Sequence, residues 1–151
     1  THAAPRRYFP DRQSLLDAVA AEGFARLGSR LREAAAAAPG YREQVRAVAA
    51  AYVDFTVAEA NLVELMFAHQ RGTEERAVAQ SAADAFAPLL EVFRRARDEG
   101  LLTAQEPEQV ALIFLATLQG ITGLTSCGVI PVEQLDELVE AAVARFDLRQ
   151  G

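Results

Sequence analysis

The 151-residue sequence contains no tryptophan and a single cysteine, Cys127, and all 15 of its basic residues are arginine. One cysteine excludes an internal disulfide framework and suits a reducing compartment. No apolar run reaches the roughly 20 residues that a membrane-spanning helix needs, and no signal peptide is visible. From these absences we expect a soluble, cytoplasmic protein.

The residue types that build most catalytic and metal sites are also scarce. Neither histidine, His2 or His69, has a Glu three residues before it, as a carboxylate–histidine metal site on a helix requires. There is no zinc-type cluster of Cys and His, no glycine-rich phosphate loop, and no histidine near Cys127 in the sequence to activate a thiolate. We therefore expect no metal, no cofactor and no enzymatic activity.

Signals for β-strands are almost absent. Alternating β-branched runs do not occur, and the good helix formers Ala, Leu, Glu, Arg and Gln dominate. The hydrophobic content of 51% beside 24% charged residues is typical of a globular chain. The sequence therefore predicts an all-α protein. The expected helices cover residues 12–38, 41–59, 62–68, 73–99, 107–124 and 135–146.

Several residues mark where these helices begin and end. Asp11 is the expected N-cap of the first long helix, and Pro39 with Gly40 ends it. Gly100 is typical of a residue that ends a helix. Pro88 lies inside an otherwise helical pattern, where we expect a kink that is tolerated by packing. The helix after Pro107 is apolar on most sides, so we expect it to be buried on most sides, in part by its own subunit and in part by a second subunit.

The charge is distributed unevenly along the chain. The net charge is −6, which argues against the body of the protein lying on nucleic acid. The first dozen residues differ, with Arg6, Arg7 and Arg12 against Asp11 alone. This asymmetry favours a basic tip on an acidic body. The alternative is that the three arginines belong to a frayed terminus without a function.

The segment from His2 to Leu16, HAAPRRYFPDRQSLL, resembles the end of the helix-turn-helix in the TetR (tetracycline-repressor) family of bacterial regulators. Phe9, Arg12 and the paired Leu15 and Leu16 fall on the family pattern. Tyr8 takes a position where the family has His or Tyr, whereas Arg6 replaces its usual first Tyr. In the body, Phe55, Met66 and Phe67 also match, whereas of a His-Gly signature in the penultimate helix only Gly120 is kept.

This resemblance implies a TetR-like helical bundle in which the last two long helices form a four-helix dimer interface. Residues 1–10 would be the end of the helix-turn-helix DNA-binding domain, 11–38 a connecting helix, and 39–151 the effector-binding and dimerisation domain. The implied function is that of a ligand-responsive transcriptional regulator, a repressor, that binds double-stranded operator DNA as a homodimer. A small hydrophobic or aromatic effector would release it.

Three sets of residues follow as candidates. The DNA-binding candidates are Thr1, His2, Arg6, Arg7, Tyr8 and Arg12. The candidates for an effector pocket are Tyr52, Phe55, Met66, Phe67, Phe86, Leu90, Phe93, Phe114 and Gln119. The candidates for the dimer interface are Leu118, Ile121, Thr122, Leu124, Thr125, Leu138, Val139, Ala142 and Phe146.

Two other classes of function remain open. One is a helical protein–protein interaction module that binds neither DNA nor a small molecule and whose arginine-rich start is incidental. The other is a helical enzyme with a dry pocket, which the scarcity of carboxylate and histidine constellations disfavours.

Overall fold

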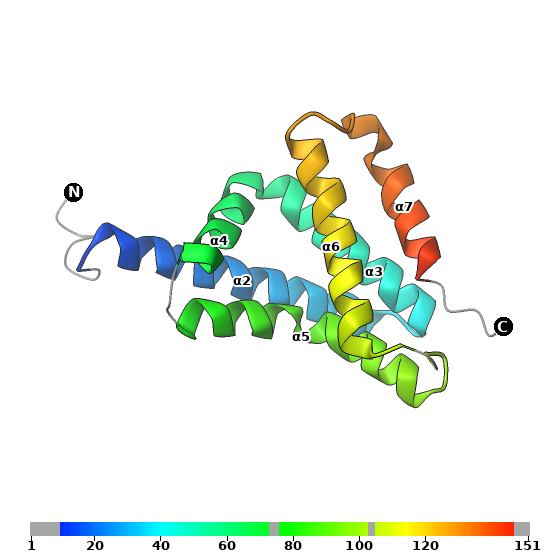
Figure 1. Cartoon of the computed structure of the whole chain (residues 1–151). Coiled ribbons are helices and arrows are strands. Elements are labelled where there is room, and N and C mark those ends of the chain that lie inside the picture. Colours follow the sequence, from blue (N-terminus) through cyan, green and yellow to red (C-terminus); the bar gives the residue numbers. More distant parts are fainter. Residues whose placement is uncertain (1–9, 73–75, 103–104, 147–151) are drawn as a thin grey trace.

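The computed structural model describes residues 10–72, 76–102 and 105–146, and every regular element within these ranges is helical. The all-α prediction is therefore confirmed. The elements are α2 (Arg12–Ala37), α3 (Tyr41–Ala58), α4 (Ala60–Gly72), α5 (Arg76–Asp98), α6 (Pro107–Ser126), the 3₁₀ helix η1 (Val132–Gln134) and α7 (Leu135–Arg145). In Figure 1, α2 begins at one end of the molecule, and α6 and α7 lie toward the other.

Helix α2 begins where the sequence predicted. The Asp11 backbone is extended, and its carboxylate accepts a hydrogen bond of 2.7 Å from the backbone N–H of Ser14. This bond is the main cause of the lowered pKa of Asp11. With 26 residues, α2 is about 39 Å long. It therefore extends from the beginning of the described chain across the body of the protein.

Helix α2 packs most extensively against α5, and the two helices lie side by side in Figure 1. A Cβ atom added to Gly28 would lie 2.9 Å from the Cα of Ala85, which is too close for a real contact. Gly23 makes a similar approach to α4, where an added Cβ would lie 2.6 Å from the sulfur of Met66. Two glycines of α2 thus allow two other helices to approach its backbone closely.

The third predicted helix, 62–68, was too short. The structure places the break at Glu59, whose N–H donates to the Phe55 carbonyl over 2.9 Å, and α4 then runs from Ala60 to Gly72. The polar stretch after Ala68 was expected to end the helix. A polar face does not end a helix that has one side on the core, and the helix continues to the next glycine.

Helix α5 continues through Pro88. The predicted end at Gly100 is confirmed, because this residue has a φ of +76°. The N–H of Gly100 donates to the Arg97 carbonyl over 2.9 Å, and the N–H of Leu101 donates to Ala96 over 2.8 Å. These bonds satisfy carbonyls that the helix end leaves without a partner and turn the chain toward α6.

Within its own subunit helix α6 is buried on one side, and the prediction that a second subunit covers the rest of its apolar surface stays a prediction. Val110, Phe114 and Leu118 face the core, whereas Leu112 is 67% exposed and Ile113 is 53% exposed. By length and composition α6 is apolar enough to cross a membrane, with 28% of its most apolar stretch buried. Core helices of soluble proteins pass the same test. A second apolar face of α6 therefore remains uncovered by its own subunit.

The chain closes the core with α7. The hydroxyl of Tyr41, at the start of α3, donates to the Phe146 carbonyl over 2.8 Å. The ring of Phe146 packs edge-on against Phe114 at 4.8 Å, and Phe114 packs in the same way against Phe93 at 5.6 Å. This aromatic cluster joins α5, α6 and the end of α7.

We predict that Gly28→Ala lowers the free energy of unfolding by about 1 to 2 kcal/mol. The added methyl group must displace the backbone of α5, and this cost exceeds the gain in helix propensity. Thermal or urea unfolding measures the change. Ser29→Ala, at an exposed neighbouring position, is the control and should change stability by less than about 0.5 kcal/mol. Equal stability of the two variants would contradict the close approach of α2 and α5.

Candidate functional site

Most of the DNA-binding candidates lie outside the described residues, namely Thr1, His2, Arg6, Arg7 and Tyr8. Arg12 is described and is the exposed first residue of α2. Its position next to the capped helix end leaves the guanidinium in solvent, where it is accessible to a phosphate.

An apolar cavity of about 560 Å³ lies between α2, α4, α5 and α6. Three aromatic rings form part of its wall. Phe67 and Phe86 stack with their ring centres 6.5 Å apart, and Phe24 meets both rings edge-on at 5.8 and 6.3 Å. The lining residues are Phe24, Phe67, Ala79, Ala82, Ala83, Phe86, Ala87, Leu89, Leu90, Glu108, Ala111, Leu112 and Leu115. Such a lining suits a hydrophobic or aromatic molecule.

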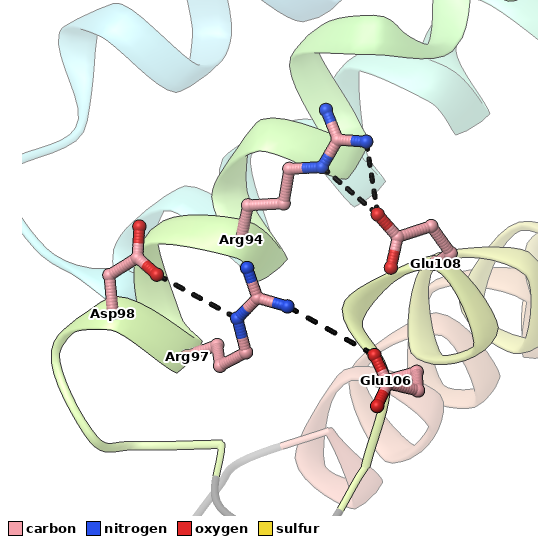
Figure 2. Close-up of polar contacts among 5 residues, drawn as sticks. All are labelled: Arg94, Arg97, Asp98, Glu106 and Glu108. Carbon is pink, nitrogen blue, oxygen red and sulfur yellow. Dashed lines mark hydrogen bonds and ion pairs between the residues drawn. The ribbon is translucent and has the colours of Figure 1, made fainter.

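Among the described residues of this lining Glu108 is the one ionisable group, and it is paired with Arg94. The Nε and Nη2 atoms of Arg94 lie 3.1 and 3.0 Å from one carboxylate oxygen of Glu108 (Figure 2). The pKa of Glu108 is lowered, first by its own backbone N–H at the start of α6 and then by Arg94. The carboxylate thus stays ionised while its charge is neutralised by a partner.

Figure 2 also shows how the ends of α5 and α6 are joined. Arg97 lies between two carboxylates, at 3.7 Å from Asp98 and 4.0 Å from Glu106. Exposed pairs of this kind each contribute at most about 1 kcal/mol. Together with Arg94 and Glu108 they hold the first turn of α6 beside α5, at the rim of the apolar cavity.

A second, polar cavity of about 490 Å³ opens between α3, α4 and α6. Its polar lining includes Thr56, Asn61, Glu64, Gln119 and Thr122, and Phe67 borders this cavity as well as the apolar one. We call these two spaces the apolar cavity and the polar cavity. They meet at one phenylalanine of α4.

Tyr52 does not line the polar cavity, but it binds and orients Gln119, which does. Its hydroxyl donates a short hydrogen bond to the Oε1 atom of Gln119, which joins α3 to α6. Tyr52 is 1% exposed, and this burial raises the pKa of its phenol. The phenol is therefore neutral and able to donate at any physiological pH.

The structure divides the predicted pocket residues into separate groups. Phe67, Phe86 and Leu90 line the apolar cavity, and Gln119 lines the polar one. The remaining candidates line neither cavity. Phe55 packs under the guanidinium groups of Arg26 and Arg30, Met66 packs against Gly23, and Phe93 and Phe114 belong to the aromatic cluster near α7.

One wall of the apolar cavity was not predicted from the sequence. Phe24 belongs to the apolar stripe of α2, and nothing in the sequence distinguishes it from the other residues of that stripe. The alanines of α5 do carry a signal, because Ala79, Ala83 and Ala87 recur every four residues on the side of the helix that also holds Phe86 and Leu90. Small residues between large ones on one side of a helix leave space between helices.

The candidates for the dimer interface are also divided. Leu118, Thr122, Val139 and Ala142 are buried within their own subunit. Ile121, Thr125, Leu138 and Phe146 are half-buried, and Leu124 is 44% exposed. The most exposed large apolar side chains of α6 are those of Leu112 and Ile113, which were not among the candidates for the dimer interface. The role of all these residues between subunits stays a prediction.

Among the described residues, no group of three or more His, Cys, Asp or Glu side chains is placed to hold a metal ion. Cys127 is exposed at the end of α6 and borders the polar cavity. Its Sγ atom lies 3.5 Å from the Leu124 carbonyl of the same helix.

We predict that Tyr52→Phe lowers the free energy of unfolding by about 0.5 to 1.5 kcal/mol, because Gln119 loses its partner in a partly buried position. The double variant Tyr52→Phe, Gln119→Leu should recover most of this loss, since it removes both polar groups. A double-mutant cycle of thermal unfolding measures the coupling. Additive losses in the double variant would contradict a direct bond.

Comparisons with known proteins agree with this architecture. A family model described as "Tetracyclin repressor-like, C-terminal domain" matches residues 45–146. A solved structure from Rhodococcus sp. RHA1, described as a protein with unknown function, is similar with a TM-score of 0.88 and 32% sequence identity. The match covers 97% of this chain and 76% of that one. The comparison with curated proteins gave no match.

Proposed function

The chain belongs to the tetracycline-repressor-like family of C-terminal domains, and from this premise we propose that it is the body of a ligand-responsive transcription regulator. The regulator is a cytoplasmic repressor that binds operator DNA as a homodimer. A small hydrophobic effector releases it. In this proposal residues 1–10 end the DNA-binding domain, residues 11–38 connect it to the body, and residues 39–151 bind the effector and the second subunit.

The proposal rests on one observation. Helix α2 lines the apolar cavity and also leads toward the end of the chain where we expect DNA to bind. Phe24 of α2 forms part of the apolar cavity wall, and the same helix begins at the exposed Arg12. The two residues are twelve positions apart, or about 18 Å along the helix. An occupant that displaces Phe24 therefore moves a rigid element that leads toward the DNA-binding end.

The mechanism is an equilibrium between two arrangements of the dimer. Recognition helices in a dimer must be spaced to match half-sites about one helical turn apart, so a small change in the direction of α2 weakens both contacts. An effector shifts the equilibrium only by its difference in affinity for the two arrangements. The aromatic wall formed by Phe24, Phe67 and Phe86 supplies this difference when an occupant forces the rings apart.

The uncovered face of α6 supports the homodimer. Ile113 and Leu124 expose large apolar side chains on one side of this helix. Gly120 has open space where a Cβ would stand. A helix with a second apolar face and a gap of this kind suits close contact with another helix.

We predict that Arg12→Ala, in the natural protein with its DNA-binding helices, weakens binding to all duplex sequences. Each lost phosphate contact reduces the slope of log affinity against log salt by about 0.9. Fluorescence anisotropy with labelled DNA over a range of salt concentrations measures this slope. Arg145→Ala removes the same charge from α7 and should leave the slope unchanged. If both variants keep the wild-type slope, Arg12 does not contact phosphate.

We predict that Ile113→Glu converts the dimer into a monomer, because it places a charge in an apolar interface. Size-exclusion chromatography with light scattering measures the mass of each species. Val57→Glu is the matched control, since Val57 of α3 is 55% exposed and Ile113 is 53% exposed. The control should remain dimeric. A dimeric Ile113→Glu variant would place the interface elsewhere.

A further inference from the structure

One face of α6 lines both cavities. Glu108, Leu112 and Leu115 border the apolar cavity, and Gln119 and Ser126 border the polar cavity. These positions follow one another at intervals of three, four or seven residues, so they lie on one side of the helix. From Glu108 to Ser126 this side is about 27 Å long. Phe67 of α4 lines both cavities, so they adjoin along this side of α6, and we call the two together the trough, with the apolar cavity next to α5 and the polar cavity next to α3.

The polar end of the trough offers several hydrogen-bond acceptors beside the amide groups of Asn61 and Gln119, which can also donate. The hydroxyl of Thr56 donates to the Val53 carbonyl over 2.9 Å, and that of Thr122 donates to the Leu118 carbonyl over 3.0 Å. Both hydroxyl protons are thus engaged by their own helices, and the oxygen lone pairs remain to accept. The carboxylate of Glu64 only accepts when ionised. Glu64 and the two threonine oxygens are therefore suited to a group that carries several donors.

The charged residues that line the trough favour a cationic group. None of the described residues that line either cavity is Arg, Lys or His. Glu108 is neutralised by Arg94, whereas Glu64 forms no ion pair with any residue of the described chain. Glu64 is therefore the one uncompensated charge in the lining among the described residues. A carboxylate or phosphate on the occupant would be repelled there, and a cation would be attracted.

We propose that the effector is an amphiphilic organic cation. Its apolar body occupies the apolar cavity against Phe24, Phe67 and Phe86. Its donor-rich head, an ammonium group, passes Phe67 and binds Glu64, with Thr56 and Thr122 as acceptors nearby. This inference rests on the proposed function, because it names the chemical class of the molecule to which the regulator responds.

The test uses three probes with the same apolar body and different heads, namely phenylbutylamine, phenylbutanol and phenylbutyrate. Isothermal titration calorimetry on the whole protein measures the affinity of each. We expect the ammonium probe to bind about three- to fivefold tighter than the alcohol, as for an exposed ion pair, and the carboxylate probe to bind most weakly. Glu64→Gln should remove the preference for the ammonium probe and leave the affinity for the alcohol unchanged.

Two further variants test where the probes bind and which carboxylate causes the preference for the ammonium probe. Glu99→Gln removes the same charge from the exposed end of α5, away from both cavities, and should keep the wild-type preference. Ala83→Phe fills the apolar cavity and should weaken all three probes by about tenfold. Circular dichroism and thermal unfolding of each variant confirm that it is folded.

The outcomes separate the inference from the proposed function. Equal affinities for the ammonium and carboxylate probes, or a preference that survives Glu64→Gln, would overturn the cationic head while the effector cavity stands. If no probe binds, or if Ala83→Phe has no effect on any of them, the apolar cavity is not an effector site. In that case the proposed function fails together with the inference.

Discussion

The close approach of α2 and α5 at Gly28 and Ala85 is the constraint on which the rest of the structure depends. It holds the longest helix against the body at one point, where a Cβ would have only 2.9 Å of space. On the N-terminal side of this contact, one turn away, Phe24 reaches into the apolar cavity. In the proposed mechanism this contact is a fixed point, and an occupant of the cavity would press on α2 beside it.

The apolar cavity is lined by several small residues of α5, which alternate with Phe86, Leu89 and Leu90 of the same helix. Ala79, Ala83 and Ala87 face the rings of Phe24 and Phe67, and the alanine side chains leave the space unfilled. Further along the same helix, Phe93 packs against Phe114 and closes the core. One helix thus supplies both a tightly packed end and an open end. The tight end keeps the fold stable, which leaves the open end free to adapt to a ligand.

Helix α6 combines three roles on different sides. One side packs into the core through Phe114 and Leu118, and one side lines the trough from Glu108 to Ser126. A further side exposes Ile113 to solvent, where we propose that a second subunit binds. An occupant of the trough and a partner subunit therefore contact the same rigid element. If both proposals hold, this arrangement links effector binding to the geometry of the dimer through α6, in addition to the path through α2.

The sequence by itself determined the fold class and most helix boundaries, because these follow from local chemistry. Asp11 caps α2 and Gly100 ends α5 wherever the helices later pack. It also indicated Phe67 and Phe86 as pocket residues, yet it grouped them with Phe93, which lies in the core. Only the tertiary structure separated these rings. Helical spacing tells which side of a helix faces inward, whereas the size of the residues on the opposite helix decides whether that space is filled or open.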